Sequence, residues 1–294
     1  MAYQEKMWQD FYERAWAYRA EFMRKCLRGG ANSCQAIGEL AKMERTHVLS
    51  MNDNKDMSWE KLNIEGGNSL SFANVPILQY SSTNGKEIII PYHANYNFSD
   101  FLIDVFDGSG GYDCIVELGC GYGRNLFHIF YNGGARDVPY FGGEFTQSGV
   151  EIAQDLAKAT PGMDATFFHF NHLEPNVDII KEHGFKRAFV FTCHTIEQVK
   201  AISDDWFGVI ASMAKHVRCV HLEPYGFQAK HIGDVSLKHQ NFMIQNGWNL
   251  NFFDTLKNAV ANKQIVLDDT ILEIGCSTDP YNPGSIACWH SDME

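Results

Sequence analysis

Residues 114–125 read CIVELGCGYGRN, and this stretch decides the fold of the 294-residue chain. The first five residues form a short apolar run that is typical of a buried strand. Glycine then stands at every second position, and apolar residues with helical spacing follow at Leu126, Phe127, Ile129 and Phe130. Glycine permits positive φ and close approach of a ligand to the backbone, and a helix start offers free N–H groups. The stretch therefore predicts a strand, a tight turn and a helix that together hold a polar small molecule.

The spacing of the three glycines argues against two common nucleotide motifs. In the dinucleotide pattern G-x-G-x-x-G the third glycine comes one place later than Gly123, and Arg124 stands where that pattern wants Gly or Ala. The phosphate loop G-x-x-x-x-G-K-[ST] is absent. What remains, E-x-G-x-G-x-G after a strand, resembles motif I of the class I S-adenosylmethionine-dependent methyltransferases. The resemblance implies S-adenosylmethionine as cofactor, S-adenosylhomocysteine as product, and cofactor contacts at Glu117, Gly119, Cys120, Gly121, Tyr122, Gly123 and Asn125.

An acidic residue supports this interpretation independently. Glu144 lies 25 residues after Gly119, at the end of a strand expected over 138–144. Doubly wound proteins place an acidic side chain there to accept hydrogen bonds from both ribose hydroxyls. The resemblance further implies a polar contact to the adenine amino group after a third strand, 165–170, where many members carry Asp. Here the candidates are His169 and Asn171, with Phe145 as an apolar face for the adenine and Cys193 at the end of a fourth strand, 187–191.

The remaining pattern predicts the rest of the sheet. A fifth strand is expected over 217–222, and residues 271–276 echo the first strand but lack its second and third glycines. They read as strand six, which pairs with strand seven, 285–290, in an antiparallel hairpin that resembles the end of the methyltransferase sheet. We therefore predict an α/β fold with a doubly wound seven-stranded sheet, parallel with a terminal antiparallel hairpin. The resemblance covers roughly residues 95–294 and implies a Rossmann-like methyltransferase domain over 96–294, with a substrate-side insertion at about 224–262.

The N-terminal region, residues 1–95, is predicted to be a helical and β-hairpin extension. Apolar residues recur at the helical period from Trp8 to Leu27, and a second helix is expected over 33–45. These helices are interpreted either as a cap packed on the main domain, or as a lid or homodimer arm that encloses substrate. Residues 46–75 are expected to be a linker with short turns. Asn84-Gly85 between two apolar runs predicts a hairpin.

Catalytic candidates come from strand ends, because open parallel sheets bind ligands outside the carboxyl ends of their strands. His194 is the first candidate for a general base, since the resemblance implies that residues 192–198 lie beside the sulfonium. The fallback candidates are Glu197, His221 and Glu223. The segment before the first strand often overlies cofactor or substrate in this family, and long insertions carry specificity. The substrate candidates are therefore Tyr92, His93, Tyr96, Tyr225 and Trp248.

Composition restricts the partners. With 45% hydrophobic residues the chain can bury a sizeable core, while a net charge of −12 argues against nucleic acid. The start, MAYQEK, lacks a signal-peptide pattern, and no apolar run approaches the ~20 residues of a membrane span. The eight cysteines form no C-x-x-C, and the twelve histidines show no H-x-x-x-H spacing, so no metal site is expected. We expect a cytoplasmic protein without nucleic-acid or membrane partners.

Taken together, these features predict an S-adenosylmethionine-dependent methyltransferase that acts on a small molecule. The aromatic and histidine-rich lining suits O- or N-methylation of a neutral or aromatic acceptor, such as a natural-product or sugar intermediate. One alternative is another chemistry with the same cofactor, such as cleavage or cyclisation. Others are a non-catalytic cofactor-binding or dimerisation module and a nicotinamide dehydrogenase.

Overall fold

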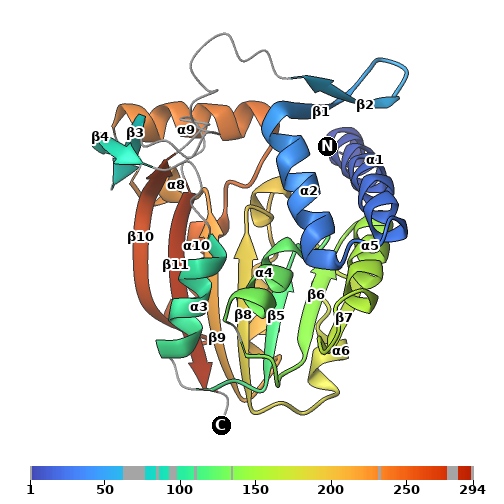
Figure 1. Ribbon diagram of the computed structural model, residues 1–294. Helices are drawn as coiled ribbons and strands as arrows, with labels where there is room; N and C mark the ends of the chain where they lie inside the picture. The colour runs from blue at the N-terminus through green and yellow to red at the C-terminus, as the bar shows by residue number, and fades with distance from the viewer. Residues whose placement is uncertain are drawn as a thin grey trace.

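A nine-stranded sheet forms the centre of the computed structural model, which describes residues 2–61, 77–83, 86–92, 98–108, 111–133, 135–230, 233–276 and 284–292. The strand order is β4-β3-β10-β11-β9-β8-β5-β6-β7 (Figure 1). Seven of these strands are β5 Cys114–Leu118, β6 Tyr140–Glu144, β7 Ala165–His169, β8 Arg187–Cys193, β9 His216–Glu223, β10 Val266–Cys276 and β11 Gly284–Asp292.

The pairing of these seven strands confirms the predicted sheet. β5 pairs in parallel with β6 and β8, and the parallel ladder continues to β7 on one side and β9 on the other. β11 runs antiparallel to both β9 and β10, which makes the terminal hairpin. The chain reverses its direction of travel across the sheet between β5 and β8, so the carboxyl ends of these strands border the crevice where open α/β sheets bind ligands.

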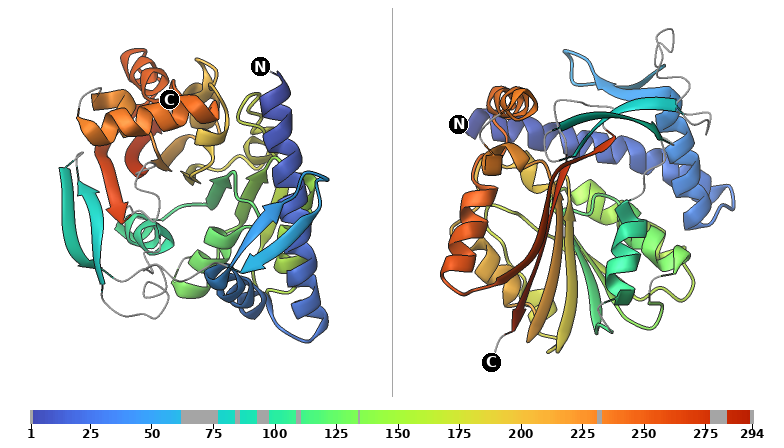
Figure 2. Two further views of the ribbon diagram at one scale, coloured as in Figure 1. Left: turned by 90° about the horizontal axis from the view of Figure 1, so that it is seen from above. Right: turned by 90° about the vertical axis from the view of Figure 1, so that its left-hand side faces the viewer.

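Helices cover both faces of the sheet, as the edge-on view in Figure 2 shows. Ile115 of β5 belongs to one hydrophobic core and its neighbours Cys114 and Val116 to the other, so the strand is buried on both sides. One face carries α3 Phe98–Gly108, α4 Arg124–Asn132 and α5 Gln147–Lys158. The other carries α6 Asp178–Lys181, α7 Trp206–Ala211 and α10 Phe252–Ala261. Two further helices, α8 Gly226–Lys230 and α9 Asp234–Asn246, lie within the long connection after β9.

The N-terminal region differs from the prediction in one place. The two predicted helices are present as α1 Ala2–Arg28 and α2 Ser33–Thr46. The linker expected over 46–75 is wrong for residues 47–61, which form a hairpin of β1 His47–Met51 and β2 Met57–Lys61. Asn52 closes the turn by accepting the N–H of Asp56 at 2.9 Å. Most side chains of this hairpin are exposed, so it carries little of the hydrophobic alternation that reveals a strand.

The second predicted hairpin extends the main sheet. It consists of β3 Ile77–Thr83 and β4 Lys86–Tyr92, paired in register with Thr83 opposite Lys86. The predicted turn, Asn84-Gly85, lies outside the described residues. β3 also pairs with the end of β10, where Ser82 faces Gly275. The hairpin is therefore continuous with the sheet.

Apolar residues recur at the helical period from Val199 to Met213 and predict a helix there, but this prediction is wrong for its first half. A short 3-10 helix at Ile196–Gln198 and α7 are separated by irregular chain. The side chain of Asn251 explains this, because it accepts the N–H of Ile202 at 3.0 Å and donates to the Ile202 carbonyl at 2.8 Å. These bonds take the place of the helical ones that Ile202 would otherwise make.

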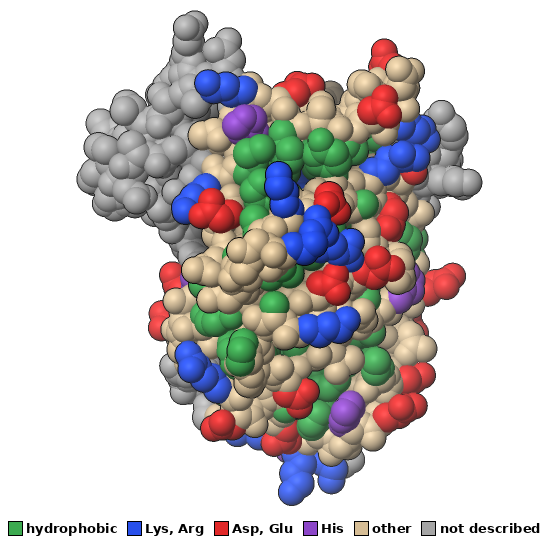
Figure 3. Space-filling model, turned by 45° about the vertical axis from the view of Figure 1, so that its right-hand side comes forward, with side chains coloured by type: hydrophobic (Ala, Val, Ile, Leu, Met, Phe, Trp, Pro, Cys, Tyr) green, Lys and Arg blue, Asp and Glu red, His purple; other side chains and the backbone are tan. Residues whose placement is uncertain are grey.

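Two surface properties complete the fold. On the face shown in Figure 3, acidic and basic side chains are interspersed rather than gathered by sign. Among the helices that the structure describes, none has both the length and the apolar character needed to cross a membrane.

Candidate cofactor and substrate site

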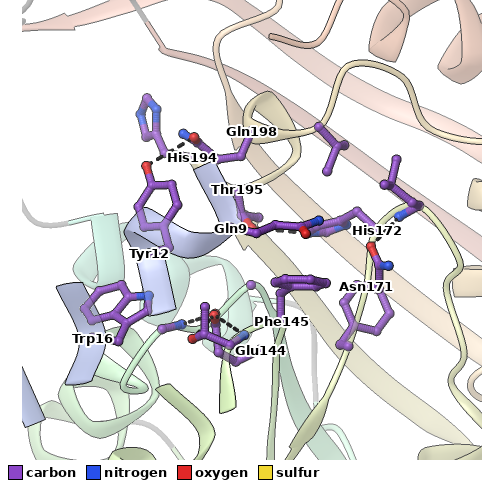
Figure 4. A pocket seen from close by; sticks show the side chains of 16 residues that line it. Gln9, Tyr12, Trp16, Glu144, Phe145, Asn171, His172, His194, Thr195 and Gln198 are labelled. Atoms are coloured by element: carbon purple, nitrogen blue, oxygen red, sulfur yellow. Dashed lines mark hydrogen bonds between the residues drawn. The ribbon is translucent and has the colours of Figure 1, made fainter. Parts of the chain in front are cut away.

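A cavity of about 150 Å³ lies at the carboxyl ends of β5, β6, β7 and β8 (Figure 4). At roughly 30 Å³ per water molecule this volume holds about five of them, so the cavity accommodates a small organic molecule. Its wall comes from the glycine turn, from the segments after β6, β7 and β8, and from α1. The lining residues are Gln9, Tyr12, Trp16, Gly119, Gly121, Glu144, Phe145, Thr146, Phe170, Asn171, His172, Leu173, His194, Thr195, Gln198 and Val199.

The glycine turn depends on the absence of side chains. Gly119, Gly121 and Gly123 all have positive φ, at +81°, +55° and +81°. A Cβ atom on Gly119 would lie 1.8 Å from Thr195 Oγ1, and one on Gly121 would lie 2.8 Å from the Trp16 ring. Only glycine satisfies both the backbone conformation and these contacts.

Glu144 joins the turn to the end of β6. Its Oε2 accepts the N–H of Gly121 at 2.9 Å, while Oε1 accepts the N–H and the hydroxyl of Thr146 at 2.9 and 2.7 Å. The residue is only 6% exposed, yet it lines the cavity. These bonds hold the carboxylate in one orientation. Oε1 already accepts two hydrogen bonds and Oε2 accepts one, so Oε2 retains a lone pair for a hydroxyl donor.

Glu117 lies behind the turn with an unsatisfied oxygen. Oε1 accepts a hydrogen bond from Asn125 at 2.7 Å, whereas Oε2 is buried and has no hydrogen-bond partner among the described residues. Burial raises the pKa of the Glu117 carboxyl to about 8, and the bond from Asn125 opposes that rise. A cationic group near Oε2 would stabilise the ionised form.

The segments after β6 and β7 supply a second, less polar part of the cavity. Phe145 lines it, and Asn171 holds its own loop by accepting the N–H of Leu173 at 2.9 Å. His172 is 6% exposed, with Nε2 at 3.2 Å from Thr195 Oγ1 and with Nδ1 buried and unpartnered among the described residues. Burial lowers the pKa of His172 to about 3, so this imidazole is neutral. A neutral imidazole with a spare nitrogen can serve a ligand as donor or acceptor.

The loop after β8 carries His194. This residue has a positive φ of 50°, and its Nδ1 lies 3.4 Å from Glu197 Oε2. Glu223 holds the same loop by accepting the N–H groups of Thr195 at 3.1 Å and of Glu197 at 3.3 Å. Burial lowers the pKa of His194, but its hydrogen bond to Glu197 and the charges of Glu197 and Glu223 outweigh this effect and raise that pKa above its usual value. The imidazole is thus oriented at the cavity wall by two acidic side chains.

The helix α1 closes one side of the cavity, as Figure 4 shows for Tyr12 and Trp16. The Tyr12 hydroxyl donates to Gln198 Oε1 at 3.1 Å, which links α1 to the loop after β8. Glu13 fixes the helix to the start of α5 by accepting the N–H groups of Gln147 and Ser148, each at 2.9 Å. The N-terminal region therefore forms part of the cavity wall.

The structure brings many of the predicted residues to this cavity. Those that line it are Gly119, Gly121, Glu144, Phe145, Asn171 and His194. Others lie in the same turn, strand ends and loops without lining it, and these are Glu117, Cys120, Tyr122, Gly123, Asn125, Cys193, Glu197 and Glu223. His169 is exposed and packs its ring against Phe145 at 5.4 Å, so Asn171 is the better placed of the two adenine candidates.

Three predicted residues lie elsewhere. His221 is fully buried, with its ring nitrogens bonded to Thr192 and Trp289 at 2.8 Å, so it cannot reach a substrate. Tyr225 is buried and donates to the Ile286 carbonyl at 2.7 Å, and Trp248 packs edge-on against Phe242. The side chain of Tyr92, and the whole of His93 and Tyr96, lie outside the described residues.

The sequence analysis missed the contribution of α1 and, after β7, those of Phe170, His172 and Leu173. Gln9, Tyr12 and Trp16 are three and four residues apart, so they share one helix face. In the sequence, Tyr12 and Trp16 belong to the apolar stripe of the predicted helix. Each also carries a polar group that suits the wall of a binding site. The described residues contain no group of three His, Cys, Asp or Glu side chains arranged to hold a metal ion.

Comparison with known proteins bears on the fold. No protein-family model matches the sequence, and no curated protein does. The methyltransferase domain of bacterial CtHen1 is 17% identical, with 65% of this chain and 96% of that chain covered, at a TM-score of 0.44. Geranyl diphosphate methyltransferase in complex with GPP and sinefungin is 12% identical, with 67% of this chain and 78% of that chain covered, at a TM-score of 0.46. Magnesium protoporphyrin IX methyltransferase from Synechocystis PCC 6803 with bound SAM is 14% identical, with 66% of this chain and 78% of that chain covered, at a TM-score of 0.40.

The strand order establishes the class of fold without these neighbours. An antiparallel β11 inserted between β9 and β10, beside five parallel strands, is the arrangement of the class I S-adenosylmethionine-dependent methyltransferase fold. A fold of this kind hosts many chemistries, so the function must be argued from the site.

The raised pKa of Glu117 predicts a pH dependence of stability. Between its ordinary value of 4.5 and about 8, the folded protein holds a proton that the unfolded chain has lost. Stability therefore falls as pH rises through this window, by at most about 1.4 kcal/mol per pH unit. The variant Glu117→Gln cannot titrate at this position. The difference in unfolding free energy, variant minus native protein, should therefore shift in favour of the variant from about pH 5 to about pH 8. Urea unfolding at a series of pH values measures this difference, and a constant difference contradicts the assignment.

Proposed function

We propose that this protein is an S-adenosylmethionine-dependent methyltransferase that acts on an uncharged small molecule. One observation carries the proposal, namely the carboxylate of Glu144, which is bonded to the glycine turn and exposed to the cavity at the end of β6. An acidic acceptor there suits two ribose hydroxyls. The glycine turn beside it leaves the backbone open to the amino-acid end of the same ligand.

The unsatisfied polar atoms of the site fit this cofactor. Oε2 of Glu117, behind the glycine turn, and Nδ1 of His172, a residue of the cavity wall, are both buried without partners among the described residues. In our proposal Glu117 with Gly119 and Gly121 holds the amino-acid end and Glu144 holds the ribose. Phe145, Asn171 and His172 hold the adenine.

The nature of the acceptor follows from the remaining wall. Among the residues that the structure describes, those that line the cavity include Tyr12, Trp16 and Phe170 but no Lys or Arg. A phosphorylated or strongly acidic acceptor would lack a counter-charge there, so a neutral or aromatic compound suits the wall better. When bound, S-adenosylmethionine supplies a methyl group activated by its sulfonium.

His194 is the proposed general base for an acceptor that carries an O–H or N–H group. Glu197 fixes the imidazole through Nδ1, which leaves Nε2 to take the acceptor's proton as the new bond to the methyl carbon forms. The bonding electrons of the broken C–S bond remain on sulfur. The other task of the site is positioning, because methyl transfer requires the acceptor in line with that bond.

Calorimetric titration of the native protein with S-adenosylmethionine, S-adenosylhomocysteine and NAD tests the proposed function. We expect saturable binding of the two adenosyl compounds at one site per chain and none of NAD. Binding of NAD alone, or of none of the three, would overturn the proposal.

His194→Ala should lower turnover by about 100-fold, within the 10²–10⁴-fold range of general base catalysis, while S-adenosylhomocysteine binds as in the native protein. The raised pKa of His194 also predicts that kcat of the native enzyme rises with pH through an ionisation above 6.5. His128→Ala, on α4 outside the cavity lining and paired with Asp100, is the matched control. Unchanged turnover in His194→Ala removes this residue from the mechanism.

A further inference from the structure

A second hollow lies at the opposite end of the sheet, where β8 and β9 begin and β11 ends, close to the C-terminus in Figure 1. Its volume is about 620 Å³, within the range of small-molecule sites. β8 spans seven residues between this end and the cofactor end, or about 20 Å at ~3.3 Å per residue. The hollow is therefore separate from the site described above.

The strand register places six charged or titratable side chains in this hollow. Arg187 of β8 is paired with His216 of β9, which is paired with Asp292 of β11. Two residues further along β9, Arg218 is paired with His290 of β11, and Asp268 of β10 bonds to both. Paired residues and residues two apart share one face of a sheet. These side chains thus form a compact array on a single face.

The array replaces what is elsewhere a hydrophobic surface. One register row further along the same face, Phe191, Val220 and Cys288 are all buried in the core. Arg187 and Arg218 are diagonal neighbours on β8 and β9, a separation at which long side chains can reach the same ligand.

Both arginines line the hollow, beside two pairs of histidine and aspartate. His216 binds Asp292 at 2.7 Å and His290 binds Asp268 at 2.7 Å, so each carboxylate is engaged by an imidazole. Arg218 reaches Asp268 only at 3.4 Å, and its Nε has no hydrogen-bond partner among the described residues. The guanidinium of Arg187 lies 5.1 Å from the centre of the Tyr112 ring, which holds it over the wall of the hollow.

We propose that this hollow binds a small molecule bearing an oxyanion, either phosphate or carboxylate, between Arg187 and Arg218. Planar guanidinium groups match such anions with paired hydrogen bonds, and the two histidines provide further N–H donors. The carboxylates of Asp268 and Asp292 weaken the attraction and so restrict the site to ligands that engage both arginines. A ligand here would be distinct from the cofactor and from the methyl acceptor.

Calorimetric titration of the full chain in low-salt buffer without phosphate tests this site. The probes are inorganic phosphate, citrate and ADP. Phosphate tests for a free inorganic anion, citrate for a polycarboxylate, and ADP for a phosphate group attached to a larger molecule. We expect at least one to bind saturably at one site per chain, with about tenfold weaker binding in Arg218→Gln and in Arg187→Gln, because each loses a charge-assisted hydrogen bond. Asp292→Asn should bind the same probe several-fold more tightly, because it removes a like charge.

Arg28→Gln is the charge-matched control, since Arg28 is exposed on α1 and pairs only with Glu21 among the described contacts. It should bind the probe as the native protein does. Failure of all three probes, or equal weakening by Arg28→Gln and by both hollow variants, would overturn the proposal. Thermal unfolding of each variant without ligand checks that it is folded. The same variants should bind S-adenosylhomocysteine as the native protein does. If the native protein did not bind S-adenosylhomocysteine, that result would contradict the proposed function but not the oxyanion site.

Discussion

Glu144→Gln is expected to weaken the binding of S-adenosylhomocysteine by about 10- to 100-fold. The charge-assisted hydrogen bond from a ribose hydroxyl to Oε2 would be lost, at roughly 1.5–3 kcal/mol. The substitution also creates a local conflict. Both carboxylate oxygens accept N–H groups, from Gly121 and from Thr146, so an amide nitrogen in either position opposes a donor with a donor. Loss of affinity should therefore exceed what the missing charge alone would cause.

Glu151→Gln is the matched control for this variant. Glu151 lies on α5 with 51% of its side chain exposed, and its bonds are to Gln147 and Arg24 on the surface. Calorimetry should return the native affinity for Glu151→Gln. Native affinity in Glu144→Gln would mean that the carboxylate at the end of β6 does not hold the ligand, and the proposed cofactor site would fail with it.

Gly119→Ala is expected to abolish cofactor binding, through displacement of Thr195. The new Cβ would lie 1.8 Å from Thr195 Oγ1, so the loop after β8 must move away from the turn. That movement would also break the bond between Thr195 and His172 and disturb the neighbouring His194. We expect no measurable binding of S-adenosylhomocysteine together with a lower melting temperature.

Gly162→Ala separates the two causes of that effect. Gly162 has nearly the same φ, +82°, but a Cβ there would meet nothing within 4 Å. Gly162→Ala should lower the free energy of unfolding by only ~1–2 kcal/mol, the cost of an alanine in the left-handed conformation. It should leave ligand affinity unchanged. Equal effects of the two substitutions on affinity would show that backbone strain, and not the contact with Thr195, is responsible.

Much of the sheet was predictable because the parallel strands β5, β6, β8 and β9 are mostly buried on both faces. Such strands appear in the sequence as short apolar runs. Their alternation with helical segments indicates a parallel sheet with helical crossovers. The hairpin at residues 47–61 escaped prediction because it is mostly exposed, with Leu49 as its buried residue. The irregular segment after Gln198 escaped because its conformation depends on Asn251, a residue about fifty positions away. Long-range hydrogen bonds of this kind leave no local pattern.

The site was predictable to the extent that strand ends converge. The positions of Gly121, Glu144 and Asn171 follow from the order of the strands alone. The contribution of α1 could not be inferred, because no sequence pattern states where an amphipathic helix docks. His221 shows the opposite error, since a strand-end histidine was read as chemical although it fills the core between Thr192 and Trp289.

The docking of α1 has a kinetic consequence for any ligand in the cavity. The helix is attached by side-chain contacts, such as the bonds of Glu13 to the start of α5, and not by the ladder of a sheet. We therefore expect that α1 can open without unfolding of the strands beneath it. Residence time of the ligand and the opening of this helix should therefore be coupled. Amide hydrogens of α1 should exchange more slowly with solvent when the cavity is filled, although the helix lies outside the sheet that carries the glycine turn.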